Sequence, residues 1–509
     1  MSAITMSRRA ATVLVLLVAT VALAQAGLDD DRVMLQGFYW ESYRHGHPQR
    51  FPSFGTKRWY EIVRENAPMV REGRFDLIWL PPPSFAGEIS AGYNPKEYFR
   101  LDNSYGSFAQ HRAMLEALLR HGVEPVADIV INHRDGASGW ADFKNPAWGV
   151  WAICETDEAF HTPASGIANT PAAERGRCEE PAADYTRHGG TTYQYASFRD
   201  VAHTDPRVRR DIVRSLRQLR SAGYRGWRYD MVHGYHPKWI ALYNRLTTPT
   251  FSVGEYDWGA HNEQRGWIWH TATDPAAPGS ERLKSASSVF DFTTLFTLEQ
   301  IRDGRYHALY GFGNGIGMVG DTTDNVAWKN RAVTFVQNHD LGYRTNEDGT
   351  PQPGHESDKF AHNWQLEQAY AHVLTHPGVP TVFWKHYFDF GADLRNKIRA
   401  LVNARKVAGV HAGSAVHLQD NARASGVYAA RVVGRHGDLY VRLGGSDAQW
   451  EPSRSNYGGY REYAHGAGWK VWVGLPGNPA FREAPLKAPF PVPAYVPAEQ
   501  INVSDVPER

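Results

Sequence analysis

Short apolar runs alternate with amphipathic stretches along most of the chain. The runs are apolar nearly throughout instead of alternating apolar with polar, which is typical of strands buried on both faces. Strands that alternate with helices imply parallel βαβ units. The predicted strands are residues 33–39, 76–80, 125–131, 226–231, 251–255, 289–292, 333–337 and 379–384.

The stretches between these runs carry helix signals. Residues 108–121 have helical spacing and are followed by Gly122, a typical stop. Asp205 and Pro206 supply a cap and a first residue for a helix that runs to residue 222. Two more helices are predicted at 362–374 and 392–408. Eight strands with intervening helices predict an α/β fold, a (β/α)₈ TIM barrel.

Two regions depart from this pattern. Residues 134–200 have neither helical nor strand period, and an irregular stretch of that length predicts an inserted lobe after strand 3. Residues 410–475 alternate between polar turns and apolar strands, which predicts a C-terminal antiparallel, sandwich-like β domain. A Pro-rich, extended tail follows at 476–509. The barrel domain then consists of 27–133 and 201–409.

Residues 1–26 have the features of a signal peptide. Arg8 and Arg9 precede an apolar run at 10–24, and residues 24–26 form an A-x-A cleavage site. The run is shorter than the ~20 residues of a spanning helix, and no later segment suggests one. We therefore expect a secreted protein, extracellular or periplasmic, without a membrane anchor after cleavage. In an oxidising compartment Cys154 and Cys178 are expected to form a disulfide, with two buried free thiols as the alternative.

Composition removes several classes of function. Lys and Arg number 55 against 54 Asp and Glu, so no basic surface for nucleic acid is indicated. An aromatic content of 13% excludes a disordered chain. Two cysteines exclude a thiolate metal cluster.

Polar residues gather at the predicted strand ends. In a parallel barrel these ends share one rim, where functional side chains lie. A structural rim would not need several carboxylates, because like charges at close range cost free energy. The sequence therefore predicts an active site there. Its members are Asp128, Asn132, His133, Arg228, Asp230, Glu255, Asn338, His339 and Asp340.

The residue types at this rim favour glycoside hydrolysis. Phosphate-loop, dinucleotide-binding, serine-elbow and HExxH motifs are absent from the sequence. Facing carboxylates suit attack at an anomeric carbon, where one is ionised and a second donates a proton to the leaving oxygen. A third carboxylate would raise the pKa of the donor and stabilise the positive charge of the transition state.

Four segments carry a resemblance to a known family. They are 128–133 (DIVINH), 226–230 (GWRYD), 254–255 (GE) and 335–340 (FVQNHD). With these motifs the sequence resembles the α-amylases of glycoside hydrolase family 13, from about residue 33 to residue 473. Within the family it looks most like bacterial maltooligosaccharide-forming enzymes, of the maltotetraose-forming type, and plant α-amylases.

The resemblance implies a role for each matching residue. Asp230 would be the nucleophile, Glu255 the general acid and base, and Asp340 the residue that binds sugar hydroxyls and stabilises the transition state. Asp128 would be a structural partner of the site. His233 stands where relatives usually carry Lys or Arg, which puts the preferred chain length in doubt. The residues implied to contact substrate are Tyr93, His133, Arg228, His233 and His339.

The resemblance also implies calcium, whose oxygen ligands the sequence offers. The ligands would be Asn132, Asp184, Asp200 and the carbonyl of Gly234, with Glu179 as a further acid in the lobe. The substrates implied are starch and maltooligosaccharides, hydrolysed at internal or near-terminal α-1,4 bonds by a retaining double displacement, and a monomer is expected.

Other functions remain open at this point. An α-glucan transglycosylase would use the same residues, and a non-catalytic glucan-binding protein would use the same fold. The presence of all three catalytic carboxylates argues against the binding protein. Trp148, Trp151, Trp267 and Trp269 are candidates for sugar contact or, equally, for the core.

Overall fold

The computed structural model describes residues 28–179, 199–257, 259–311, 313, 315–360, 363–453, 459–474 and 483–508. The predicted signal peptide, residues 1–26, lies outside the described residues.

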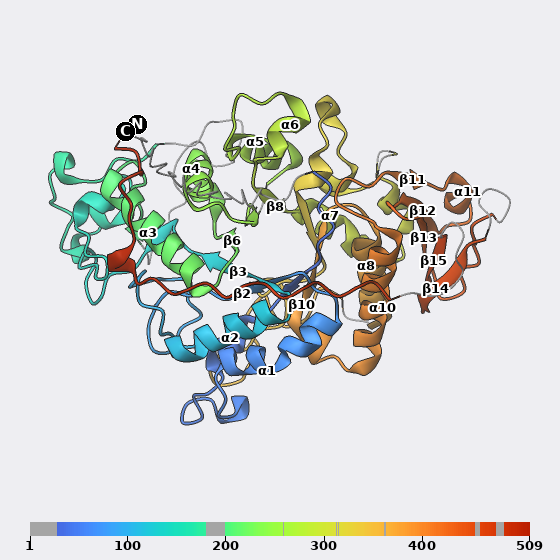
Figure 1. Cartoon of the computed structure of the whole chain (residues 1–509), viewed down its shortest axis with the longest axis horizontal. Coiled ribbons are helices and arrows are strands. Elements are labelled where there is room, and N and C mark those ends of the chain that lie inside the picture. The colour runs from blue at the N-terminus through green and yellow to red at the C-terminus, as the bar shows by residue number, and fades with distance from the viewer. Residues whose placement is uncertain are drawn as a thin grey trace, which may run out of the picture.

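Eight parallel strands close into a barrel in the order β1-β10-β9-β8-β7-β6-β3-β2 (Figure 1), which confirms the predicted fold class. Most strands end one to three residues earlier than their apolar runs, because the chain leaves the ladder where the polar rim residues begin. The strands are β1 (Met34–Gln36), β2 (Leu77–Leu80), β3 (Glu124–Ile129), β6 (Gly226–Tyr229), β7 (Phe251–Gly254), β8 (Ser288–Phe290), β9 (Ala332–Phe335) and β10 (Val379–Phe383).

Helices surround the barrel (Figure 1), and the cap predicted at Asp205 is present. The Ser107 side chain accepts a hydrogen bond from the Gln110 N–H at the start of α2, and Asp205 caps α3, which has Pro206 at its first position. The helices are α1 (Trp59–Glu72), α2 (Phe108–Arg120), α3 (Pro206–Ala222), α4 (Lys238–Thr247), α5 (His261–His270), α6 (Gly279–Leu283), α7 (Phe292–Leu298), α8 (Asn363–Thr375), α9 (Trp384–Phe388), α10 (Ala392–Ala408) and α11 (Asp420–Arg423).

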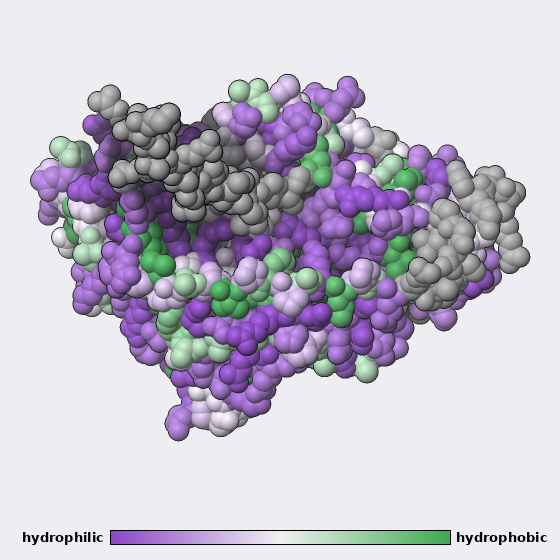
Figure 2. Space-filling view, viewed as in Figure 1, coloured by the Kyte–Doolittle hydropathy of each residue, from purple (hydrophilic) through white to green (hydrophobic). Residues whose placement is uncertain are grey.

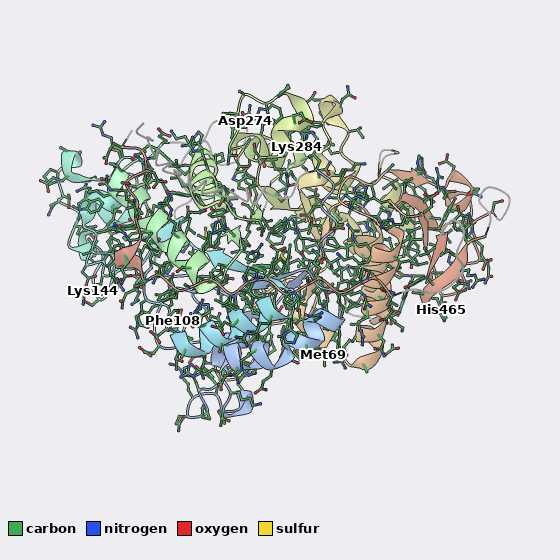
Figure 3. All side chains as sticks on the ribbon, viewed as in Figure 1. Met69, Phe108, Lys144, Asp274, Lys284 and His465 are labelled. Carbon is green, nitrogen blue, oxygen red and sulfur yellow. A yellow bond between two sulfur atoms is a disulfide. The ribbon has the colours of Figure 1, made fainter. Side chains whose placement is uncertain are left out.

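The lobe between β3 and β6 is built from short pieces. A two-stranded antiparallel ladder, β4 (His133–Arg134) with β5 (Arg199–Asp200), closes its base against the barrel. Its described residues otherwise form 3-10 turns at 150–152, 158–160, 163–165 and 172–174. The disulfide between Cys154 and Cys178 is present, with the two Cα atoms 5.4 Å apart. In Figure 3, Lys144 marks this lobe.

The C-terminal domain is a single antiparallel sheet instead of the sandwich-like module that the sequence predicts. Its order is β11-β12-β13-β15-β14, and α8 and α10 of the barrel cover one face in place of a second sheet. His465 on β14 marks its outer edge in Figure 3. The strands are β11 (Val416–Leu418), β12 (Tyr428–Val433), β13 (Asp438–Leu443), β14 (Arg461–Gly466) and β15 (Trp469–Gly474).

The described part of the tail, residues 483–508, crosses the barrel from the C-terminal sheet to α3 (Figure 1). The Phe490 N–H donates to the Leu119 carbonyl of α2 at 2.9 Å, and Arg217 of α3 pairs with Asp505. The sequence predicts extended chain here, and the structure adds that it lies along the barrel.

The face seen in Figure 2 is mostly hydrophilic with small, scattered apolar patches. Over the described residues, the exposed large hydrophobic side chains are Phe296, Tyr343 and Leu486. No helix there is long and apolar enough to cross a membrane.

Candidate active site

A cavity of about 460 Å³ opens at the carboxyl ends of the barrel strands. It brings together six of the nine residues that the sequence selects at this rim, from segments that follow β3, β6, β7 and β9. Its lining consists of Trp40, Tyr93, His133, Asp230, Met231, His233, Glu255, Asp257, Phe292, Phe296, Asn338, His339, Asp340, Leu341 and Lys359.

One buried guanidinium organises the floor of this cavity. Arg228 on β6 donates through Nη1 to Asp128 and to Asp230, each at 2.6 Å, and its Nη2 lies 2.8 Å from Glu255. Its side chain is 1% exposed, so these interactions are shielded from water. One cation therefore interacts with three carboxylates.

Both side-chain oxygens of Asp128 accept hydrogen bonds from protein groups. Its Oδ2 accepts hydrogen bonds from the Trp79 indole at 3.0 Å and the Tyr93 hydroxyl at 2.9 Å, and Arg228 occupies Oδ1. No side-chain oxygen of Asp128 lines the cavity. This arrangement supports a structural role, in which Asp128 orients both Arg228 and the Tyr93 ring.

Burial and charge determine the protonation of the other two carboxyls. Burial raises the pKa of Glu255 well above its ordinary value, Arg228 opposes this, and neighbouring carboxylates reinforce it. Burial also raises the pKa of Asp230, against the lowering effect of Arg228. Both directions favour a retained proton in this cluster, and at Glu255 the carboxylates of Asp230, Asp340 and Asp257 add to the effect of burial, so we assign the proton to Glu255.

The chain has specific local geometry around these two residues. Gly254 precedes Glu255 at the end of β7, and a Cβ at that position would lie 2.3 Å from the Trp267 ring, so only glycine fits. Met231 follows Asp230 with a left-handed backbone, φ 41°, an uncommon conformation for a residue with a side chain. These two features direct the carboxyls into the cavity.

Asp340 is held from its own loop. Asn338 Oδ1 accepts from the N–H groups of Asp340 and Leu341, at 2.9 and 3.1 Å, and so forms a tight turn. Gln36 on β1 donates through Nε2 to Nδ1 of His339, which leaves the Nε2–H of that ring facing Asp340 at 2.9 Å. Burial would raise the pKa of Asp340, but His339 and two arginines hold it below its ordinary range.

The structure brings every predicted substrate-contact residue to the cavity except Arg228, which lies directly beneath it. His133 Nε2 donates to the Tyr93 carbonyl at 2.7 Å, and its Nδ1 lies 3.3 Å from Asn132 Nδ2, so both of its nitrogens already have protein neighbours. His233 Nδ1 lies 3.1 Å from Asp257.

Three of the four predicted calcium ligands are described, and Asp184 lies outside the described residues. Asn132 Oδ1 is buried without a hydrogen-bond partner, and a Cβ on Gly234 would lie 2.0 Å from it. Asp200, 1% exposed, pairs through its backbone with His133. An orphaned amide oxygen and a carboxylate fit a hard cation. Over the described residues no group of three or more His, Cys, Asp or Glu suited to a metal was found, and Glu179 is paired with Lys238.

Several lining residues were missed by the sequence analysis. Asp257 lies two positions after Glu255 in the same strand-end loop, so the strand-end rule could have found it. Trp40, Phe292 and Phe296 carry no comparable signal. The four tryptophans considered as sugar contacts do not line the cavity. Trp267 is fully buried in the core, and Trp148 donates to Asp211.

Comparisons with known proteins agree with this geometry. Residues 65–264 match the family model described as the α-amylase catalytic domain, and residues 407–473 match the α-amylase C-terminal β-sheet domain. The chain is 29% identical to a probable α-amylase 2 from Arabidopsis thaliana, over 84% of this chain and 90% of the relative. It is also 29% identical to a glucan 1,4-α-maltotetraohydrolase from Stutzerimonas stutzeri, over 80% of this chain and 69% of the relative.

A cyclomaltodextrin glucanotransferase with a three-domain ABC distribution shares the fold, with a TM-score of 0.60 and 15% identity over 87% of this chain and 99% of that structure. The matches to the α-amylase catalytic domain and to these relatives make the barrel with its ring of carboxylates a glycoside hydrolase. The chain belongs to the α-amylase family, glycoside hydrolase family 13, whose members act on α-glucans as hydrolases or transferases.

Proposed function

We propose that this enzyme is a secreted α-amylase that hydrolyses internal or near-terminal α-1,4-glucosidic bonds of starch and maltooligosaccharides with retention of configuration. The observation that carries the proposal is the Arg228 bridge between Asp230 and Glu255, and the raised pKa of Glu255 supports it. Retaining glycosidases need one ionised and one protonated carboxyl in close proximity. Arg228 holds the two carboxyls together and favours the ionised form of Asp230, while burial and the neighbouring carboxylates raise the pKa of Glu255.

In the first step Asp230 attacks the anomeric carbon while Glu255 gives its proton to the glycosidic oxygen, so that the bond from that carbon to the leaving sugar breaks. In the second step the Glu255 carboxylate takes a proton from water, and the water oxygen displaces Asp230. Two displacements return the α configuration. Asp340, kept ionised by its neighbours, binds ring hydroxyls and stabilises the positive charge at the transition state.

The product anomer tests this mechanism. We expect purified mature protein to release oligosaccharides from soluble starch in the α form, visible by NMR before mutarotation, and their lengths will separate internal from near-terminal attack. Early release of the β form would contradict the retaining mechanism.

Transglycosylation is the second candidate, because Phe296 is 45% exposed at the cavity and offers a ring face for an acceptor sugar. In that case a sugar hydroxyl replaces water in the second step. The same time course on maltotetraose decides: chains longer than the substrate would indicate transfer, and shorter chains alone indicate hydrolysis.

We further propose that calcium joins the lobe to the barrel through Asn132, Asp200, the Gly234 carbonyl and Asp184. The support is the orphaned Asn132 oxygen beside Gly234. The ion would cross-link the segments that shape the cavity and take no part in the chemistry. Since an ion that binds only the folded state stabilises it, EDTA dialysis should lower the melting temperature and calcium should restore it. Unchanged melting would argue against the site, and Asn132→Ala should remove the response.

Export is proposed from the leader pattern and agrees with the Cys154–Cys178 disulfide. N-terminal sequencing of protein from the periplasm or medium should begin at Gly27. A start at Met1 in exported protein would contradict cleavage. We expect a monomer by light scattering.

A further inference from the structure

Arg344 lies behind the cavity wall, in the loop after β9, and is not among the residues that line the cavity. Its guanidinium forms an ion pair with Oδ1 of Asp340, and its Nε donates to the His339 carbonyl at 2.9 Å. The side chain is 9% exposed. Both oxygens of Asp340 therefore have a positively polarised neighbour: Arg344 at Oδ1, and His339 Nε2 at 2.9 Å from Oδ2.

The same guanidinium also packs on a second wall of the cavity. Its Cζ lies 4.0 Å from the centroid of the Trp40 ring. The Trp40 ring is parallel to that of Tyr93, within 3°, at a centroid distance of 6.0 Å. Arg344 thus contacts both a carboxylate and an aromatic ring that line the cavity.

The backbone that carries Arg344 is fixed from two directions. Its N–H donates to the His355 carbonyl at 3.1 Å, and its own carbonyl accepts from Gln352 at 2.9 Å, which makes residues 343–355 a hairpin-like loop. At the next position the Thr345 N–H donates to Glu41 at 2.7 Å, and Arg44 donates to the Thr345 carbonyl at 2.6 Å. Glu41 and Arg44 follow β1, which is separated from β9 by β10 alone, so the loop after β9 is tied to the segment after β1.

We propose that Arg344 is a positioning residue for glycosyl transfer, which holds Asp340 and Trp40 in the orientation that receives the glucose ring at the cleavage subsite. This inference rests on the proposed function, in which Asp340 binds the hydroxyls of that ring. A carboxylate that is hydrogen-bonded by Arg344 through one oxygen and faced by His339 at the other has less freedom to rotate, and support of this kind gives a site its precision.

The positive charge of Arg344 gives its positioning role a measurable effect on the pH dependence of activity. The groups that face Asp340 are His339 and Arg344 from its own loop, Arg228 from β6, Glu255 from β7 and Tyr93 from the segment after β2. Burial would raise the pKa of Asp340, and Arg344 is one of the cations that lower it. Removing that cation should raise the pKa of Asp340 and move the acid limb of the activity profile to higher pH.

The test compares Arg344→Gln and Arg344→Lys with a control, Arg50→Gln. Arg50 pairs with Glu347 on the same loop at 2.5 Å, but both side chains are about half exposed and do not touch Asp340. On maltooligosaccharides we expect Arg344→Gln to lower kcat by about 10²-fold with a smaller change in KM, since Asp340 acts mainly on the transition state. Its acid limb in kcat/KM should shift upward. Arg344→Lys should keep the acid limb and recover part of kcat, and Arg50→Gln should match wild type.

Wild-type kcat and acid limb in Arg344→Gln would overturn the inference. An equal loss of kcat in Arg50→Gln would also overturn the inference, because the loss would then reflect the stability of the loop alone. If Arg344→Gln does not fold, Arg344→Lys decides: wild-type kcat and KM in that variant would refute a role for the guanidinium fork. A wild-type enzyme without activity on α-glucans would refute the proposed function, whereas an active wild type with unaffected variants refutes only the role of Arg344.

Discussion

At the base of the barrel, where the strands begin, Asp30 and Asp76 are 7% and 3% exposed. At the mouth, Asp230 and Glu255 are 4% and 8% exposed. Burial is thus the same at the two ends, but the effect on protonation is opposite. At the base the pKa of Asp30 falls to about 2 and that of Asp76 is also lowered. At the mouth both carboxyls have raised pKa values.

The number of cations explains the difference. Around the base, three carboxylates (Asp30, Asp76 and Glu124) meet four cations (Arg32, Arg225, Lys406 and Lys487). On the floor of the mouth, three carboxylates share Arg228. A buried carboxyl keeps its charge where a cation compensates for lost hydration, and takes up a proton where the cation is shared. The charge deficit, more than burial, distinguishes the site that does chemistry.

The largest effect should come from Glu255→Gln at the mouth. The amide cannot act as an acid, so the rate of starch hydrolysis should fall by about 10³-fold or more. The melting temperature should not fall, because the amide has nearly the same shape and replaces a carboxyl that already holds its proton. Initial rates and thermal melts of the purified variant measure both quantities.

The matched variant at the base is Glu124→Gln. Glu124 pairs with Arg225 at 3.0 Å, so the comparison predicts a lower melting temperature and an unchanged rate for this variant.

A near-wild-type rate for Glu255→Gln would refute the role of Glu255 as the acid. In the wild type, activity should decline on the alkaline side as Glu255 loses its proton, because its pKa is raised.

A smaller effect, on the free energy of unfolding, is expected when low pH protonates Asp30. Burial alone would raise the pKa of Asp30, but Arg32 outweighs burial and lowers it from 3.8 to about 2. The folded state therefore binds the proton less tightly than the unfolded state. This contributes about 2 kcal/mol of stability that is present above pH 4 and lost as the pH falls towards 2. The difference in unfolding free energy between wild type and Asp30→Asn, from urea titrations at pH 6 and pH 2.5, should shrink at the lower pH. A difference independent of pH would contradict this account.

The barrel strands and the loops also differ in how far the sequence could predict them. The barrel strands were found because each is an apolar run buried on both faces, and the rim carboxylates were found because parallel strands end together. Arg344 and Trp40 were not found, because they reach the site through loops whose paths depend on contacts far away in the sequence, such as that of Arg44 with Thr345.

Three missed features have local causes: helix α1, strand β14 and the ladder in the lobe. Helix α1 carries Pro68 in its interior, a residue that normally indicates the end of a helix. Strand β14 lies at the edge of the C-terminal sheet and only one of its six residues is buried, so no apolar alternation marks it. The lobe ladder, β4 with β5, has two residues on each side, too few to produce any period.

The smallest effect should come from Lys487→Met, which removes one of the two lysines around Asp76. Lys487 belongs to the tail, its side chain is 40% exposed, and its Nζ lies 2.9 Å from Asp76. Asp76 keeps Lys406, whose side chain is only 12% exposed. Because a half-exposed ion pair is screened by water, we expect a loss of less than about 1 kcal/mol in unfolding free energy and no change in activity. Lys406→Met should cost clearly more, since Asp76 would then depend on the screened lysine alone. Equal losses in the two variants would mean that the tail holds the base as firmly as α10 does, and that the charge balance there is set by both cations together.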